Sequence, residues 1–265
     1  MSASCRLCGG AAAPVGRAML LGRDVEYRLC ARCELLQTES PTWLADAYAD
    51  AISHLDTGAV ARNRLTAQLT AVVARLVGAR GPCLDYGAGH GVFVRMMRDL
   101  GFDFRWYDTY AQNLYAGGFE GTPTDHHAIV TAFELLEHLA DVRGDIDAIF
   151  AGAPDHVLVG TLLHHGWDPA WWYLLPETGQ HVAFYSPVTL RFVAEHVGYD
   201  VIVGPEYSLF SRHAPGAVKR AVLQRLLARP SLAGIVPGRL VARGSLVQPD
   251  HEAIRQSRLR KSDTP

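Results

Sequence analysis

Short apolar runs and longer stretches of helical spacing alternate along the middle of the chain. Compact runs such as CLDY and AIVTAF, bounded by glycine or polar residues, are typical of buried strands. Longer stretches with apolar residues three or four positions apart are typical of helices. We expect strands at 82–87, 104–108, 128–133, 156–163 and 199–211, and helices at 91–101, 134–150 and 186–198. This alternation predicts an α/β fold with a doubly wound, mainly parallel sheet.

The pattern changes on both sides of this central segment. Residues 41–78 carry apolar positions at helical spacing and end at Gly78, which favours a helical connector. Farther along, 219–229 has the pattern of a short basic amphipathic helix, and the tail 257–265 is expected to be mobile. The predicted division is a small lobe at 1–40, the connector at 41–78, the α/β domain at 79–205 and a C-terminal extension at 206–265.

Four of the five cysteines form two pairs, Cys5-x-x-Cys8 and Cys30-x-x-Cys33. In a reducing compartment this spacing favours a zinc site, and the less favoured alternatives are disulfides or a redox motif. Four thiolates fill a tetrahedral shell, so the zinc is expected to be structural and to supply much of the folding free energy of the small lobe. Cys83 lies in an apolar run, which favours a buried thiol over a ligand.

Bulk properties narrow the classes of partner. The formal net charge of −2 gives no general reason to expect nucleic acid or an anionic membrane. The start, MSASCRLCGG, lacks the basic and apolar regions of a secretory signal, and no apolar run reaches the ~20 residues that span a bilayer. We therefore expect a cytoplasmic protein without a membrane span, whose oligomeric state the sequence leaves open.

A glycine-rich turn follows the first strand of the α/β segment. Asp85 stands near the end of that strand, and Gly87, Gly89 and Gly91 precede the next helix. Glycines at such a turn let a ligand approach the backbone, where the helix N-terminus offers free N–H donors. Asp108 ends the next strand, where a carboxylate can accept hydrogen bonds from both ribose hydroxyls of an adenosine-containing ligand.

Acidic and imidazole side chains gather after the third strand of this segment. In the stretch FELLEHL, Glu134, Glu137 and His138 stand at positions i, i+3 and i+4. One helical turn would place all three on the same face. Because ligand crevices open at the carboxyl ends of the strands in doubly wound folds, we expect these groups to face a ligand.

DYGAGHG, the YD at the next strand end and FELLEHL after a further strand resemble, in this order, the class I S-adenosylmethionine-dependent methyltransferases. The resemblance covers roughly residues 79–205 and implies S-adenosylmethionine as cofactor. The implied contacts are Gly87, Gly89 and Asp85 for the methionine end of the cofactor, Asp108 for its ribose, Phe133 at the strand end and, as a weak candidate for the adenine, Asp125.

The order E-x-x-E-H resembles the ubiquinone-pathway O-methyltransferases and the small-RNA 2′-O-methyltransferases. In those families it implies a divalent metal such as magnesium or manganese, held by Glu134, Glu137 and His138, and the RNA enzymes add a histidine at a place comparable to His181. Such an ion can hold vicinal hydroxyls and lower the pKa of the attacked one. The other interpretation, which the sequence slightly favours, needs no metal: His181 then acts as a general base, Glu134 bonds to the backbone near the cofactor and His138 packs as a polar residue.

The acceptor is expected to be a small molecule or a glycan. The paired cysteine knuckles resemble those of sugar C-methyltransferases, and WWYLLPETGQH is similar to methyltransferases of glycan pathways. The expected reaction is methylation of a sugar hydroxyl; the alternatives are a sugar C-methyltransferase, an RNA ribose 2′-O-methyltransferase, which the negative net charge disfavours, and a non-catalytic cofactor-binding scaffold. The expected substrate wall is aromatic and comprises Trp167, Trp171, Trp172, Tyr173, Phe184 and Tyr185.

Overall fold

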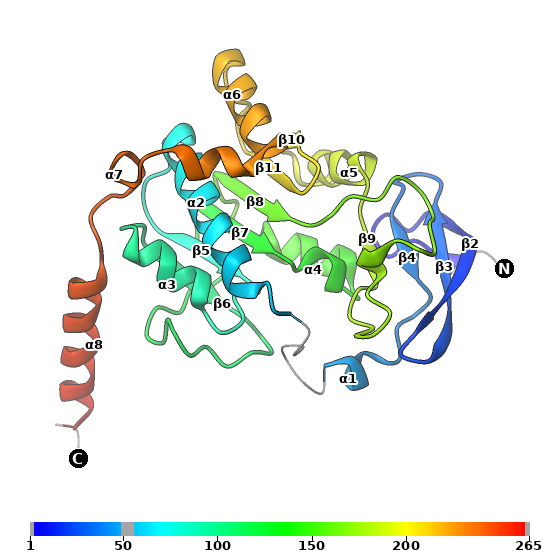
Figure 1. Cartoon of the computed structure of the whole chain (residues 1–265), viewed down its shortest axis with the longest axis horizontal. Helices are drawn as coiled ribbons and strands as arrows, with labels where there is room; N and C mark the ends of the chain where they lie inside the picture. The colour runs from blue at the N-terminus through cyan, green and yellow to red at the C-terminus, as the bar shows by residue number, and fades with distance from the viewer. Residues whose placement is uncertain (1–2, 49–55, 263–265) are drawn as a thin grey trace.

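A six-stranded central sheet organises the computed structural model, which describes residues 3–48 and 56–262 (Figure 1). Its strands lie in the order β10-β11-β8-β7-β5-β6, and the four strands β8, β7, β5 and β6 run parallel. The bounds are β5 (Cys83–Tyr86), β6 (Phe104–Tyr107), β7 (Ile129–Phe133), β8 (His156–Gly160), β10 (Asp200–Val203) and β11 (Tyr207–Ser211). The predicted α/β fold with a mainly parallel sheet is confirmed.

Helices cover both faces of this sheet. One hydrophobic cluster joins it to α2 (Ala59–Val77), α3 (Val92–Asp99) and α6 (Ala217–Ala228). A second cluster joins the other face to α4 (Val142–Ile149) and α5 (Pro187–Val197). Burial of apolar side chains in both clusters stabilises the doubly wound arrangement and holds the carboxyl ends of β5, β6 and β7 together at one edge of the sheet.

The stretch 134–150 is not one continuous helix. A 3₁₀ turn, η1 (Leu136–His138), precedes α4, and Glu134 has a left-handed backbone with φ 49°. The Glu134 N–H donates to the Gly160 carbonyl at the end of β8, so Glu134 is bound to the neighbouring strand. Asp141 then accepts a hydrogen bond from the Gly144 N–H and caps α4, which separates that helix from the turn.

Two further expectations need correction. The apolar stretch 199–211 forms an antiparallel hairpin of β10 and β11 because Gly204 turns the chain and its N–H donates to the Tyr207 carbonyl. The central sheet therefore continues beyond residue 205, where we expected the α/β domain to end. The expected mobility of the tail stays a prediction; its first part belongs to α8 (Val247–Ser262), and 263–265 lie outside the described residues.

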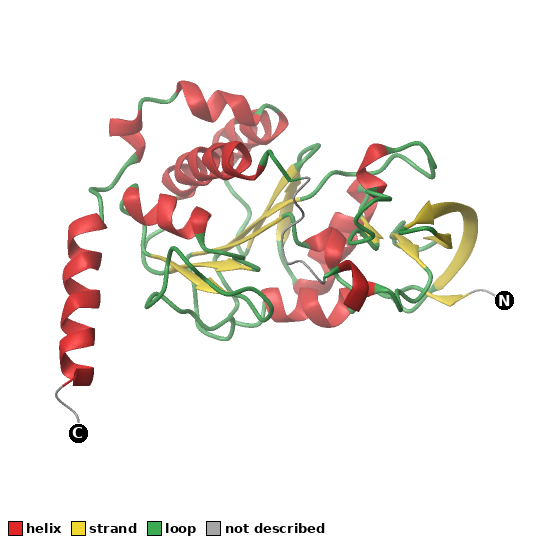
Figure 2. Ribbon diagram, turned by 60° about the horizontal axis from the view of Figure 1, so that its bottom comes forward, coloured by secondary structure: helices red, strands yellow, loops and turns green. Residues whose placement is uncertain are grey.

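A second sheet packs at one end of the molecule, opposite α8 (Figures 1 and 2). Its order is β1-β2-β3-β4-β9. The last strand comes from the α/β domain, so the small lobe is joined to that domain by main-chain pairing. The bounds are β1 (Ala3–Ser4), β2 (Ala11–Leu20), β3 (Arg23–Cys30), β4 (Leu36–Thr38) and β9 (Ala183–Phe184).

The predicted connector contains α1 (Leu44–Ala47) and α2, and Gly78 ends α2 in a left-handed conformation with φ 76°, as expected. Residues 49–55 of that stretch lie outside the described part. The C-terminal extension contains η3 (Pro230–Ile235), α7 (Gly238–Val241) and α8 after α6. Among residues 3–48 and 56–262, no helix combines the length and apolar character needed to cross a membrane.

Candidate functional site

The glycine turn lies at the carboxyl end of β5, in the centre of the parallel strands. Gly87, Gly89 and Gly91 all have positive φ values, which side chains on L residues disfavour. A Cβ atom at Gly87 would lie 2.8 Å from Leu135 Cδ1, whereas one at Gly89 would meet no atom within 4 Å. The turn is therefore packed against the chain on one side and open at Gly89, where a ligand can approach the backbone.

Asp108 supports this turn from the end of β6. Its Oδ2 accepts the Gly89 N–H at 2.9 Å, and its Oδ1 accepts the N–H groups of Tyr110 and Ala111 at 2.8 Å each. A carboxylate has about four acceptor sites, so these bonds leave room for a further donor such as a ribose hydroxyl. The sequence predicts a ribose contact for Asp108 but not its hydrogen bonds to the glycine turn, because the loop that returns to the carboxylate shows no motif.

Asp85 is buried within the sheet beneath the turn. Its Oδ1 accepts a hydrogen bond of 2.6 Å from Thr131 Oγ1 on β7. Burial raises the pKa of Asp85 to about 7, since the charged carboxylate loses its hydration. A cationic ligand group next to Asp85 would restore the ionised form, which suits the ammonium of an amino-acid moiety.

Phe133 and Asp125 lie at opposite ends of β7. Phe133 ends the strand at the crevice edge and packs edge-on against Phe93, with ring centroids 5.2 Å apart. Asp125 precedes the strand, and its carbonyl oxygen lies against Gly152 after α4. The crevice opens at the carboxyl ends of the strands, so Asp125 is not in position to meet an adenine there.

A cluster of three possible metal ligands lies beside η1. Glu137, His138 and His181 each offer one ligand atom, and these atoms all lie within 4.8 Å of one another. Glu137 is fully buried, and its Oε1 accepts a hydrogen bond of 2.6 Å from the Tyr173 hydroxyl. Its Oε2 is buried without a hydrogen-bond partner, so a buried carboxylate oxygen is left to be satisfied.

Hydrogen bonds orient both imidazoles of this cluster. His181 Nδ1 lies 2.7 Å from the Tyr173 carbonyl oxygen, which can only accept, so Nδ1 carries the proton and Nε2 keeps its lone pair. His138 Nδ1 lies 2.8 Å from the Tyr48 hydroxyl. Burial lowers the pKa of His138 and lowers that of His181 to about 4, and both rings are therefore neutral at neutral pH. Neutral imidazoles are metal ligands.

Glu134, predicted to share a metal with Glu137, is not part of this cluster. The left-handed turn at Glu134 places it before the 3₁₀ turn rather than on a common helical face. Its carboxylate lies 3.4 Å from Arg62 Nε, and Arg62 also pairs with Asp56. Burial is the main cause that raises the pKa of Glu134 to about 8, and the charge of Glu137 adds to it.

Most of the expected aromatic wall is core. Phe184 and Tyr185 are completely buried, while Trp167 and Trp171 are partly buried against the small sheet, which leaves no open ring face at Phe184 or Tyr185. Trp172 differs, with 65% of its surface exposed. The pattern of aromatic residues indicated a clustered segment correctly, but packing between the two sheets accounts for most of it.

The four paired cysteines also come together, and the cluster fits a zinc knuckle. Cys5 Sγ lies 3.5 Å from Cys33 Sγ, and Cys8 Sγ lies 3.4 Å from Cys30 Sγ. Backbone N–H groups of Leu7, Gly10 and Arg32 donate to Cys5, Cys8 and Cys30, and such donors stabilise thiolates. The hydrogen bond between Cys5 and Cys33 lowers the pKa of Cys5 to about 5 and raises the pKa of Cys33, so this pair holds one thiolate and one thiol in the absence of an ion.

Arg6 connects the cysteine cluster to the Glu137 cluster. Its guanidinium donates to the carbonyl oxygens of Ala140 and Val182, and the Val182 N–H donates to the Glu137 carbonyl at 2.8 Å. Sequence reasoning missed this residue and also Tyr48, because each acts through contacts with segments far along the chain. The basic charge of Arg6 beside a cysteine pair was the signal available.

Comparison with protein families gives a match that covers more than half of the chain. Residues 61–203 match the profile of a family described as a methyltransferase domain. Similar solved structures include the methyltransferase domain of bacterial CtHen1, which is 19% identical, with 57% of this chain and 100% of that chain covered and a TM-score of 0.40. Others are the mitomycin 7-O-methyltransferase MmcR (18% identity, 65% and 60% covered, TM-score 0.44) and a possible histamine N-methyltransferase of Thermotoga maritima (11%, 65% and 100%, 0.46). No curated protein shows a significant match.

Proposed function

Since this chain belongs to the methyltransferase domain family and is an S-adenosylmethionine-dependent methyltransferase, we propose that it methylates a hydroxyl group of a sugar, free or within a glycan, with the help of a divalent metal. The observation that carries the metal is the buried, unpartnered Glu137 Oε2 beside two neutral imidazoles, and the sugar acceptor rests on the similarity of WWYLLPETGQH to methyltransferases of glycan pathways. A carboxylate and two imidazoles are a ligand set for magnesium, manganese or zinc, so these residues fit a divalent ion.

Glu137, His138 and His181 would hold this ion. When bound, it supplies Lewis-acid polarisation of the acceptor hydroxyl, which lowers that hydroxyl's pKa. Tyr173 orients the Glu137 carboxylate, and the carbonyl of Tyr173 fixes the His181 tautomer that leaves Nε2 available. The chain thus leaves Glu137 Oε2 and the Nε2 lone pair of His181 without a competing hydrogen bond.

The cofactor would lie between Asp85 and Asp108. Gly87 and Gly89 would line its methionine end with Phe133 alongside, Asp85 would pair with its ammonium, and Asp108 would accept a ribose hydroxyl. The acceptor oxygen forms a bond to the methyl carbon as the methyl–sulfur bond breaks, and the hydroxyl proton leaves to solvent or a base. Alignment of oxygen, carbon and sulfur supplies most of the rate enhancement in such a transfer.

We also assign a structural zinc to Cys5, Cys8, Cys30 and Cys33. The short distances between the sulfur atoms and the three N–H donors support this, and four thiolates leave no open position for a substrate. The zinc would stabilise the small lobe, which in turn supplies Arg6 to the backbone beside the catalytic cluster.

The test is methyl transfer from labelled cofactor to a panel of sugars with vicinal hydroxyls, before and after removal of divalent ions with a chelator. We expect activity to fall at least about a hundredfold on chelation and to return with magnesium or manganese. Equal rates with and without chelator would remove the metal and leave His181 Nε2 as a general base. Full activity on RNA and none on any sugar would overturn the substrate class.

A further inference from the structure

Positive charge is concentrated in one segment of this chain. Between Tyr207 and Pro249 the sequence contains no aspartate or glutamate, although the whole chain has a formal net charge of −2. The basic residues of this segment are Arg212, Lys219, Arg220, Arg225, Arg229, Arg239 and Arg243. The net charge of the whole chain therefore does not report the excess of positive charge in this segment, and our expectation from the net charge did not consider it.

Most of these cations face solvent. Arg220 pairs with Asp200, and the Arg243 guanidinium lies 4.4 Å from the ring centre of Phe102. The others are exposed, and no carboxylate among the described residues forms an ion pair with them; they are Arg212, Lys219, Arg225, Arg229 and Arg239. All but Arg212 lie on α6 or α7 or on the residue between α6 and η3, and exposed cations gathered on neighbouring elements attract an anionic partner.

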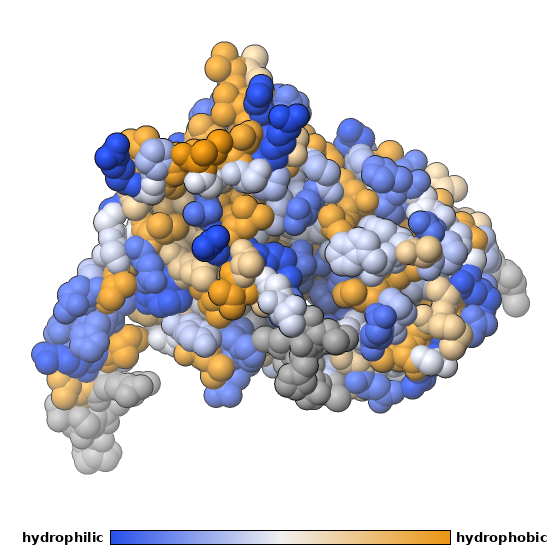
Figure 3. All heavy atoms as spheres, in the orientation of Figure 1, coloured by the Kyte–Doolittle hydropathy of each residue, from blue (hydrophilic) through white to orange (hydrophobic). Residues whose placement is uncertain are grey.

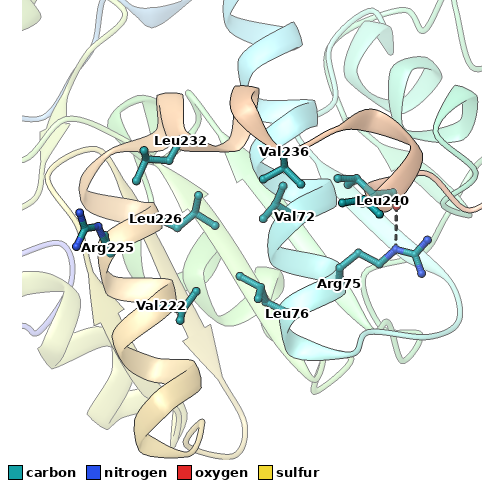
Figure 4. A pocket seen from close by; sticks show the side chains of 10 residues that line it. Val72, Arg75, Leu76, Val222, Arg225, Leu226, Leu232, Val236 and Leu240 are labelled. Carbon is teal, nitrogen blue, oxygen red and sulfur yellow. Dashed lines mark hydrogen bonds between the residues drawn. The ribbon is translucent and has the colours of Figure 1, made fainter.

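Apolar side chains stand exposed among the same cations. Val218 is 81% exposed, Ile235 74% and Leu240 64%. Between α6, η3, α7 and α2 lies a groove of ≈ 390 Å³ whose walls are almost wholly aliphatic (Figure 4). Figure 3 shows hydrophobic surface over α6 and the neighbouring η3, with hydrophilic groups at its borders. We call the exposed surface of α6, η3 and α7 the C-terminal face.

The combination of exposed cations with exposed aliphatic side chains favours one kind of anionic partner over another. A nucleic acid presents phosphates and would leave the exposed aliphatic side chains of the C-terminal face without a partner. An anionic bilayer presents phosphates above an apolar layer, which matches cations placed among exposed valine, isoleucine and leucine. We propose that the C-terminal face binds the surface of a membrane that contains anionic phospholipids, with its cations on the lipid phosphates and its aliphatic side chains below them.

Vesicle co-sedimentation of the full chain tests the charged part of this proposal. We expect binding to vesicles of phosphatidylcholine with added phosphatidylglycerol, weakening with salt, and little binding to phosphatidylcholine alone. Each cation near an anionic bilayer contributes about fivefold in affinity, so Lys219→Gln, Arg225→Gln and Arg229→Gln together should weaken binding about a hundredfold. The matched control removes the same charge from exposed arginines elsewhere, in a variant with Arg32→Gln, Arg64→Gln and Arg191→Gln.

A second pair of variants tests the contribution of the exposed apolar side chains to vesicle binding. Val218→Ser should weaken vesicle binding about threefold to tenfold, whereas Val60→Ser, at a helical position that is 67% exposed on α2, should leave it unchanged. Equal losses in the two triple variants would overturn the proposal, because the effect would then follow net charge. Binding of an oligonucleotide in preference to the vesicles, insensitive to Val218→Ser, would assign the face to nucleic acid. Self-association of the parent that Val218→Ser abolishes would assign it to a second copy.

Discussion

The two groups of possible metal ligands differ in how the chain gathers them. The cysteine cluster takes its thiols from two local pairs, whereas the other cluster joins Glu137 and His138 of η1 to His181, far along the sequence. Four thiols close a coordination shell, while three ligands leave positions open for water or substrate. On the proposed function, the locally paired cysteines hold a structural ion, and the cluster assembled from distant segments holds the ion that acts on the acceptor.

The two clusters are also physically connected. Arg6, next to Cys5, donates to the Val182 carbonyl, and Val182 adjoins His181. The strand β9 that follows His181 pairs with β4 of the small sheet. Disturbance of the cysteine cluster should therefore reach the cluster of Glu137, His138 and His181, which is the reactive cluster of the proposed mechanism. Because these contacts couple both regions, the coupling is reciprocal.

The largest effect is expected from Cys30→Ser. Loss of a thiolate from a structural zinc site removes much of a binding free energy of about 10 kcal/mol, so the small lobe should unfold and methyl transfer should be lost with it. Thermal unfolding and zinc content by mass spectrometry measure this. The control is Cys83→Ala, a buried thiol outside the cluster, which should cost about 1 kcal/mol and keep the zinc. If Cys30→Ser in the presence of chelator melted at the same temperature as the untreated parent, that result would contradict the structural zinc.

The next effect separates the two glutamates. Glu137→Gln should lower the rate about a thousandfold, because it removes the charged ligand, while cofactor affinity and zinc content stay unchanged. Glu134→Gln should cost much less, since Glu134 pairs with Arg62 outside the cluster. Steady-state rates and calorimetric cofactor binding measure both. Equal losses of rate in the two variants would mean that Glu134 belongs to the reactive site.

Asp85 is a buried carboxylate outside the Glu137 cluster, and its protonation state tests the proposed cofactor site. The raised pKa of Asp85, about 7, means that the cofactor-free protein holds this proton more tightly than the unfolded chain, with its value of 3.8. The stability of the cofactor-free protein should therefore fall as pH rises from about 4 to about 7. Cofactor affinity should move oppositely, rising about tenfold per pH unit up to pH ~7, because the ammonium needs the ionised carboxylate. Calorimetry across this range measures it, and Asp85→Asn should flatten the profile. A flat profile in the parent would exclude the Asp85–ammonium pairing.

Part of the fold and of the candidate site can be predicted from the sequence, and part cannot. The α/β alternation, the glycine turn and the cysteine pairs are local patterns, and the structure has strands, turn and cluster at those positions. The failures have two causes. Tertiary contacts decided two of them: Glu134 is held by Gly160 of a neighbouring strand, and Phe184 and Tyr185 are buried where the two sheets meet. The turn at Gly204 within 199–211 is local, and the Gly204-Pro205 pair is a turn signal that we did not use.

The smallest predicted effect tests a contact that only the structure reveals. Tyr48→Phe removes the hydroxyl 2.8 Å from His138 Nδ1 and leaves the ring in place. Partners of metal-binding histidines fix the tautomer, so affinity for the catalytic metal should fall about tenfold, and added manganese should restore the rate. Tyr27→Phe is the control, because the Tyr27 hydroxyl is buried in the small sheet without a hydrogen-bond partner. An unchanged metal requirement in Tyr48→Phe would mean that His138 is held by its burial alone, and the reactive cluster would then depend on the packing around it more than on its hydrogen bonds.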